Sequence, residues 1–129
     1  MTFAQKKTAA LACLAATNIA RNNYAPLLYR LLWSLGLQIA PPHFNGFITN
    51  LFVSGTVFAT AFGAIMTAQA VFLTHQIIPD MQGITLYFAT VGPPAGLAFG
   101  LLMATYYAFG AHKHKLPKWR DLQTSTGWE

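Results

Sequence analysis

Two long stretches without a charged side chain constrain this chain more than any other feature of its sequence. No Asp, Glu, Lys or Arg occurs between Arg30 and Asp80, and none occurs between Asp80 and Lys113. Only 9% of the 129 residues are charged, against about 25% in an ordinary soluble domain. A soluble domain this small has a large surface and normally covers it with charged side chains. The pattern therefore favours one domain with two membrane-crossing segments over a soluble core.

The two charge-free stretches predict transmembrane helices over residues 47–74 and 84–110, joined by an outer loop over residues 75–83. Each segment exceeds the ~20 residues that a helix needs to cross the hydrocarbon of a bilayer. All eight Lys and Arg residues lie before the first segment or after the second, and the positive-inside rule then places both termini in the cytoplasm. We expect an all-α integral membrane hairpin. The predicted parts are amphipathic cytoplasmic or interfacial helices (1–44), the two-span hairpin (45–110) and a basic cytoplasmic tail (111–129).

Small residues recur at every fourth position in both predicted spans, so that they line one face of each helix. In lipid, such faces let two helix backbones approach and gain van der Waals contact. We expect the two faces to pack against each other in a tight hairpin; the alternative is that they join two copies of the chain. The predicted packing residues are Gly55, Ala59, Gly63 and Thr67 in the first span and Gly92, Gly96, Gly100 and Ala104 in the second.

Two adjacent prolines, Pro93 and Pro94, interrupt the second span. A proline inside a helix removes a backbone donor and kinks or breaks the helix. We therefore expect either a kink at this pair or a membrane helix that starts at Pro93, with residues 84–92 forming a separate outer segment. A kink at this position would also suit a gate in an oligomeric pore.

An amphipathic pattern precedes the first span, in YAPLLYRLLWSLGLQIAPPHF (residues 24–44). Four leucines recur there at helical spacing, opposite Arg30 and Ser34: Leu28, Leu31, Leu32 and Leu35. The predicted helix is too short to cross a bilayer, so we expect it to lie at the cytoplasmic interface. The residues expected to contact lipid headgroups or a protein partner are Tyr29, Arg30, Trp33, Pro41, Pro42 and, from the tail, Trp119.

A further helix is predicted upstream, where residues 3–20 are rich in strong helix formers. Leu11, Ala15 and Ile19 fall along one side of it. We expect this helix to pack on the amphipathic helix or to cover the C-terminal segment HKLPKWRDL (residues 114–122). Whether it lies on lipid or on protein stays open.

Few residues offer catalytic or metal-binding chemistry. The predicted topology separates Asp80 from the other two acids, Asp121 and Glu129, and no P-loop, dinucleotide-binding, catalytic-triad or zinc-protease motif occurs. The four histidines are His43, His75, His112 and His114. We expect no cofactor, no bound metal and no nucleic-acid partner. A metal-dependent membrane enzyme that uses His43, His112 or His114 is the least favoured alternative.

The segment APLLYRLLWSLGLQIAPPHF (residues 25–44), followed by two spans and a closing LPKWRDL, resembles a family of small uncharacterised bacterial membrane proteins with a domain of unknown function. The resemblance rests, at approximate spacing, on Pro26, Tyr29, Arg30, Trp33, Gly36, Pro41, Pro42 and Phe44. It implies a fold and a location in the bacterial inner (cell) membrane. It implies no activity.

These observations together predict a non-enzymatic small inner-membrane protein that acts by association. It would serve as an accessory or assembly subunit of a larger membrane complex, or as a homo-oligomer, with the lipid bilayer and a membrane protein or further copies as its partners. The alternative is an oligomeric pore or small transporter gated near Pro93 and Pro94. The sequence leaves open the identity of the partner, the number of copies and any transported solute.

Overall fold

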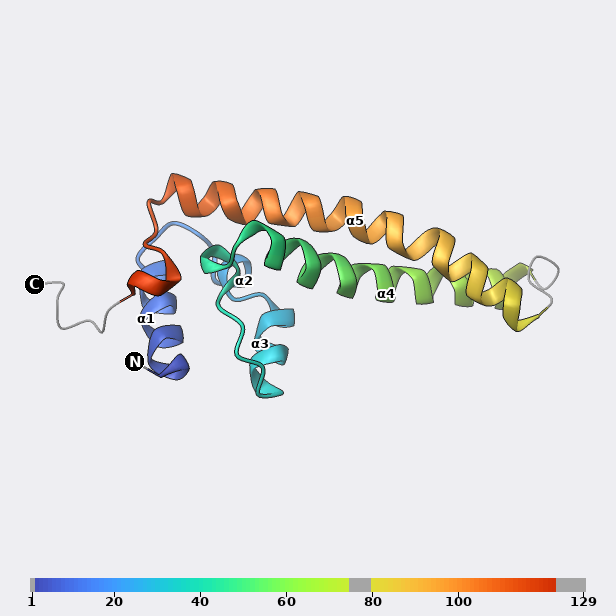
Figure 1. The fold of residues 1–129 in the computed structure, drawn as a ribbon, viewed down its shortest axis with the longest axis horizontal. Coiled ribbons are helices and arrows are strands. Elements are labelled where there is room, and N and C mark those ends of the chain that lie inside the picture. The colour runs from blue at the N-terminus through green and yellow to red at the C-terminus, as the bar shows by residue number, and fades with distance from the viewer. Residues whose placement is uncertain (1, 75–79, 123–129) are drawn as a thin grey trace, which may run out of the picture. The chain divides into compact units, whose positions relative to one another are not determined.

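The computed structural model of this protein describes residues 2–74 and 80–122 (Figure 1). The described residues form helices and turns, without a strand. They divide into two compact units: unit 1 takes residues 1–46 and 107–129, and unit 2 is Phe47–Tyr106. Part of the predicted outer loop (75–79, including His75) and the end of the predicted tail (123–129) lie outside the described residues.

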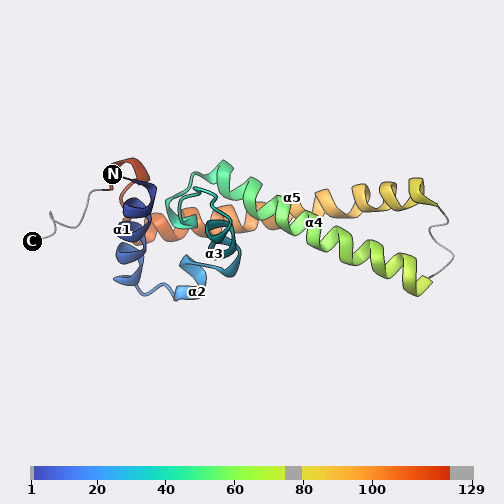
Figure 2. The ribbon, with the colours of Figure 1, turned by 90° about the horizontal axis from the view of Figure 1, so that it is seen from below.

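Unit 2 is a hairpin of α4 (Phe47–Thr74) and the portion of α5 (Met81–Lys113) that precedes Tyr107 (Figures 1 and 2). At about 1.5 Å per residue, both helices are longer than the ~30 Å hydrocarbon core of a bilayer. Each is also apolar enough to cross a membrane, and only 17% of an apolar 18-residue stretch of each helix is buried inside the protein. The core helix of a soluble protein would be mostly buried. The prediction of an all-α hairpin with two membrane-length helices is confirmed.

The second helix differs from its predicted bounds, because α5 begins at Met81 instead of residue 84 and ends at Lys113 instead of residue 110. The early start follows from a helix cap: the Asp80 carboxylate accepts a hydrogen bond from the Gly83 N–H at 2.8 Å. The helix continues through Pro93 and Pro94. The predicted alternative of a separate outer segment over residues 84–92 is therefore not what the chain forms.

Unit 1 gathers short elements from both ends of the chain. They are α1 (Phe3–Ala15), α2 (Arg21–Tyr24), α3 (Leu27–Ser34), the 3-10 turn η1 (Pro42–Phe44), the last turns of α5, and the 3-10 turn η2 (Trp119–Asp121). The core cluster consists of Ala10, Leu14, Ala40, Phe44 and Leu122, with Leu116 and Trp119 packed against it. Helix α1 thus covers the C-terminal segment, which is one of the two arrangements expected from the sequence.

The buried face of α1 only partly matches the predicted one. Leu11 and Ile19 pack, half-buried, against the core cluster, but Ile19 lies beyond the end of the helix and Ala15 is exposed. Ala10 and Leu14 are the fully buried residues. Alanine and leucine occur around the whole circumference of this helix, so hydrophobicity alone does not select the face that packs. The contact with Phe44 and Leu122 selects it instead.

Two helices of the protein end in the same hydrogen-bonded turn. After α3, Gly36 adopts a φ of 84°, its N–H donates to the Trp33 carbonyl, and the Leu37 N–H donates to the Leu32 carbonyl. This is the Schellman arrangement, in which the left-handed residue favours glycine. Gly36 therefore ends α3. Helix α5 ends in the same motif with Lys115, at a φ of 50°, in the glycine position.

Candidate functional site

The two membrane-length helices cross where their small residues face each other. A Cβ atom built on Gly92 would lie 2.8 Å from the Ala59 carbonyl oxygen, and one on Gly100 would lie 2.7 Å from the Leu51 carbonyl oxygen. A Cβ atom on Gly96 would collide with the Cβ of Ala59. The backbones of α4 and α5 are therefore in direct contact, and the crossing has no room for a larger side chain.

Six of the eight predicted packing residues form this crossing: Gly55, Ala59, Gly63, Gly92, Gly96 and Gly100. In the structure their faces meet within one chain. Ala104, farther along α5, is fully buried. Because each face already covers the other, the remaining surfaces of the hairpin are the ones available for contact with another molecule.

Aromatic rings reinforce the flank of the crossing. The rings of Phe58 and Phe99, one from each helix, stack with centroids 4.2 Å apart and planes 15° from parallel. Phe62 stacks on Phe58 in turn, at 5.4 Å. Ring pairs of this kind add attraction beyond their buried area. The stacked rings thus add side-chain contact between α4 and α5 beside the glycines, which have no side chain to contribute.

Beyond the crossing, the helices diverge toward the end of α4 and the start of α5, as Figure 2 shows. The change follows from the register. The small face of α4 continues from Gly63 to Thr67, but the facing position on α5 after Gly92 is Phe88, whose ring lies 2.8 Å from a Cβ built on Gly63. The Phe88 ring lies between the two helices at this level and keeps their backbones apart.

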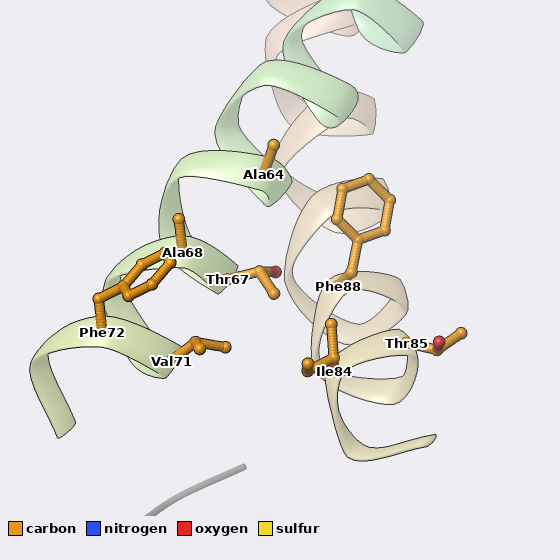
Figure 3. Close-up of a pocket in the computed structure, with 8 residues that line it drawn as sticks. All are labelled: Ala64, Thr67, Ala68, Val71, Phe72, Ile84, Thr85 and Phe88. Carbon is orange, nitrogen blue, oxygen red and sulfur yellow. The ribbon is translucent and has the colours of Figure 1, made fainter. Parts of the chain in front are cut away.

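The divergence leaves a notch of about 420 Å³ between the two helices (Figure 3). Eight residues line it: Ala64, Thr67, Ala68, Val71 and Phe72 from α4, and Ile84, Thr85 and Phe88 from α5. Its walls are mostly aliphatic and aromatic. Only two hydroxyl groups, those of Thr67 and Thr85, introduce polarity among these residues.

The Thr67 hydroxyl distinguishes the notch from the rest of the hairpin. Thr67 is only 8% exposed, and its Oγ1 atom is buried with no hydrogen-bond partner. Figure 3 shows its side chain directed into the space between the helices. The other threonines with a recorded bond on these helices donate to the carbonyl four residues earlier, at 2.7–2.9 Å: Thr60, Thr85, Thr90 and Thr105. A buried hydroxyl without a partner costs free energy that a partner group would recover.

In unit 1, a buried histidine packs against the last turns of α5. The His43 ring is 4% exposed and meets the Tyr107 ring edge-on, with centroids 5.1 Å apart. A Cβ atom on Gly110 would lie 3.0 Å from the His43 Cδ2 and Nε2 atoms, so glycine makes room for the imidazole. Burial, and secondarily the nearby His114, lower the pKa of His43 to about 4. The imidazole is therefore neutral at neutral pH.

His43, His112 and His114, the histidines considered as metal ligands, differ in burial and do not form a metal site within the part of the chain that the structure describes. His43 is buried, His114 is half-buried and His112 is exposed. Across residues 2–74 and 80–122, no group of three or more His, Cys, Asp or Glu side chains lies close enough to hold a metal ion.

Several residues expected at an interface lie inside unit 1. Pro41 and Pro42 are fully buried. Tyr29 is 1% exposed, and its hydroxyl accepts a hydrogen bond from the Asn45 side chain at 3.4 Å. Burial raises the pKa of Tyr29, and the bond to Asn45 opposes this increase. These three side chains are therefore part of the interior of unit 1 and are not available for contact with lipid or a partner.

The other three interface candidates differ in exposure. Arg30 is exposed. Trp33 is half-buried, and its indole N–H donates to the Ile39 carbonyl at 2.7 Å. Trp119 is also half-buried, between Phe3 at 5.8 Å and Phe44 at 6.3 Å. Arg30 and the two indole rings thus keep some surface for contact with lipid or protein.

Sequence reasoning missed the notch, although one signal for it was present. The small-residue face of α5 stops at Gly92, while that of α4 continues to Thr67. Only the register of the two helices shows that Phe88 stands opposite the end of the α4 face. The sequence predicts Thr67 as a packing residue, whereas in the structure its hydroxyl lies at the notch without a hydrogen-bond partner.

Comparison with known proteins adds a family to this geometry. No curated protein and no solved structure matches the chain. One family model matches residues 1–122, which include all of unit 2, with the crossing and the notch, and the described part of unit 1. The chain thus belongs to DUF6404, a family of unknown function.

Proposed function

We propose that this protein acts by association in a membrane, as a non-enzymatic accessory or assembly subunit of a larger membrane complex or as a homo-oligomer. The Thr67 hydroxyl carries the proposal, because it is buried in the notch without a hydrogen-bond partner. Hydrocarbon offers no hydrogen-bonding group, so a polar group buried there favours contact with a helix that supplies one. A partner helix that inserts a polar side chain into the notch would fill it and, once the two helices shift enough to expose the hydroxyl, bond to Thr67.

The membrane we propose is the bacterial inner membrane, with both termini in the cytoplasm. The support is the distribution of charge: all eight Lys and Arg residues belong to unit 1, and Phe47–Tyr106 contains none. Short segments rich in Lys and Arg stay on the cytoplasmic side of a membrane during insertion. The notch would then lie toward the opposite face.

Co-purification with variants of the notch tests the association. A tagged copy expressed at its native level is solubilised gently, and the proteins that accompany it are quantified. We expect Thr67→Val, which keeps the side-chain shape, to reduce partner retention about three- to twentyfold, the range that an interhelical hydrogen bond in a membrane supports. Filling the notch with Ala68→Phe should reduce retention at least as strongly.

Matched variants separate the notch from the helix as a whole. Thr60→Val removes a hydroxyl that is already bonded to the Thr56 carbonyl, and Ala61→Phe adds the same ring outside the notch. Both should retain the partner at the level of the natural sequence. Equal retention by all four variants would refute the role of the notch.

The pore or small transporter gated near Pro93 and Pro94 remains an alternative prediction with its own test. The hydroxyls of Thr60, Thr85 and Thr90 are bonded to their own helices, so they do not favour a hydrated path. Purified protein reconstituted in liposomes should give no flux of ions or small solutes. Flux that Pro93→Ala changes would favour the pore over the association.

A further inference from the structure

Helix α3 turns its aromatic side inward and exposes one row of leucines, whereas Leu28 and Leu32 are half-buried. Tyr29 is buried, and the Trp33 ring meets it edge-on at a centroid distance of 6.2 Å. Leu27, Leu31 and Leu35, at spacings of four residues, are 74%, 54% and 69% exposed. The leucine side is therefore not the side that builds the interior of unit 1. An exposed row of large aliphatic side chains normally marks a contact surface.

Basic side chains accompany this leucine row. Arg30 lies on α3 itself and is exposed. The Lys7 ammonium, on α1, lies 5.1 Å from the centroid of the Trp33 ring, which places a second cation near α3, on its aromatic side. Across the described part of unit 1, eight Lys and Arg residues stand against one acid, Asp121, which pairs with the adjacent Arg120 at 3.5 Å. The unit therefore complements a negatively charged surface.

Chain connectivity keeps this surface near a bilayer. The first segment of unit 1 ends at Gly46 and α4 begins at the next residue. The second segment begins at Tyr107, which follows Tyr106 of the hairpin directly within α5. No linker separates the unit from either membrane-length helix. Because the hairpin crosses twice, both junctions lie on the same side of the membrane.

We propose that α3 inserts into the interface of a membrane leaflet that contains anionic phospholipid. Leu27, Leu31 and Leu35 enter the boundary between headgroups and acyl chains, while Arg30 beside the row meets lipid phosphate. Lys7, on the aromatic side of α3, adds to the positive potential that attracts the unit to anionic lipid. An apolar row accompanied by cations is the combination that binds such an interface. This surface is independent of the notch, so the inference does not rest on the proposed association.

Site-directed spin labels test the insertion in the full-length chain. Single labels replace Leu31 or Leu35, with Asn22 as an exposed control on α2, all in a Cys13→Ala background. The protein is reconstituted without any partner in nanodiscs of phosphatidylcholine, with or without phosphatidylglycerol. The accessibility of each label to oxygen, which concentrates in lipid, is compared with its accessibility to a water-soluble nickel complex.

In anionic discs, we expect the labels at Leu31 and Leu35 to favour oxygen and the label at Asn22 to favour nickel. Lys7→Gln and Arg30→Gln should each lower the ratio of inserted to free α3 about fivefold, the factor expected for one cation near an anionic surface. Because each protein carries a single label, the charge variants are compared with one of the two leucines, Leu31 or Leu35, still in place.

Three results would overturn the proposal. Nickel-accessible labels in both kinds of disc would mean that α3 does not enter lipid. Equal insertion in neutral discs, unaffected by Lys7→Gln and Arg30→Gln, would refute the role of anionic lipid. Labels that are protected only in native membranes, and not in the purified system, would assign the leucine row to a protein partner.

Discussion

Each of the two units is stabilised internally by a different kind of contact. Unit 1 packs large side chains from both ends of the chain around a small core, with His43 buried beside Tyr107. Unit 2 brings two backbones together through glycine and alanine, and its large side chains mostly point outward. Water drives the first kind of packing by the hydrophobic effect, whereas lipid gives the second only close contact and hydrogen bonds.

The difference implies that the two units respond to different changes. Unit 1 should be sensitive to the loss of a large side chain and to the protonation of His43. Unit 2 should be sensitive to the gain of a side chain at its crossing. Among the described residues, tryptophan occurs at Trp33 and Trp119 of unit 1, and Phe47–Tyr106 contains none, so tryptophan fluorescence does not report unit 2.

The largest expected effect is a cavity in unit 1. Leu14 is fully buried in the core cluster, so Leu14→Ala should lower the free energy of unfolding of unit 1 by about 3–4 kcal/mol. Denaturant titration followed by tryptophan fluorescence measures the change. Leu27→Ala, at an exposed position, should change it by less than about 0.5 kcal/mol. A similar loss of stability in both variants would contradict the placement of Leu14 in the core and of Leu27 at the surface.

Acid should weaken unit 1 without opening the hairpin. The pKa of His43 is lowered from 6.5 to about 4 in the folded protein, so folding favours the neutral imidazole. The stabilisation is complete above pH 6.5 and disappears as the pH falls toward 4, for a loss of about 3 kcal/mol. Tryptophan-monitored unfolding at a series of pH values measures it. His43→Leu should flatten this pH dependence, and His112→Gln, an exposed position, should leave it unchanged.

A side chain at the crossing should separate the hairpin while unit 1 stays folded. Gly96→Leu places a side chain against Ala59 and the Gly55 carbonyl, and overpacking of this kind costs about 2–3 kcal/mol. Distances between spin labels at the exposed positions Phe52 and Leu102 should increase in this variant. Gly46→Ala, with nothing within 4 Å of the added carbon, is the control. Unchanged label distances in Gly96→Leu would contradict the backbone contact.

The smallest effect concerns the notch in protein without a partner. Thr67→Val removes a buried hydroxyl that has no hydrogen-bond partner, so the isolated hairpin should gain up to about 1 kcal/mol. Thr105→Val removes a hydroxyl that is bonded to the Leu101 carbonyl and should give no gain. Unfolding of the hairpin in detergent, followed by circular dichroism, compares the two. A clear loss of stability in Thr67→Val would mean that its hydroxyl is already satisfied within the chain.

The sequence predicted unit 2 better than unit 1, for a physical reason. The period of four in Gly55, Ala59 and Gly63 is tied to one helical face, and a similar face on the second helix leaves few ways to pack them. In α3, by contrast, both the leucine side and the Tyr29–Trp33 side are apolar, so the pattern could not tell which one faces inward. The core of unit 1 also joins residues more than a hundred positions apart, such as Leu14 and Leu122, which no local pattern reveals.

The candidate site was partly predictable for the same reason. Thr67 belongs to the small-residue face and was found with it. Its free hydroxyl depends on the divergence of the helices at Phe88, and that depends on the register of α4 against α5. Periodicity within one helix carries no information about register between two helices.

The mass of the intact assembly tests the central claim of association most directly. The natural sequence, expressed at its native level and released from the membrane with its surrounding lipid, would be examined by native mass spectrometry. We expect a particle that contains this 14.1 kDa chain together with a stoichiometric membrane partner or further copies. A single chain with lipid alone, and no protein that accompanies it, would contradict the proposed association.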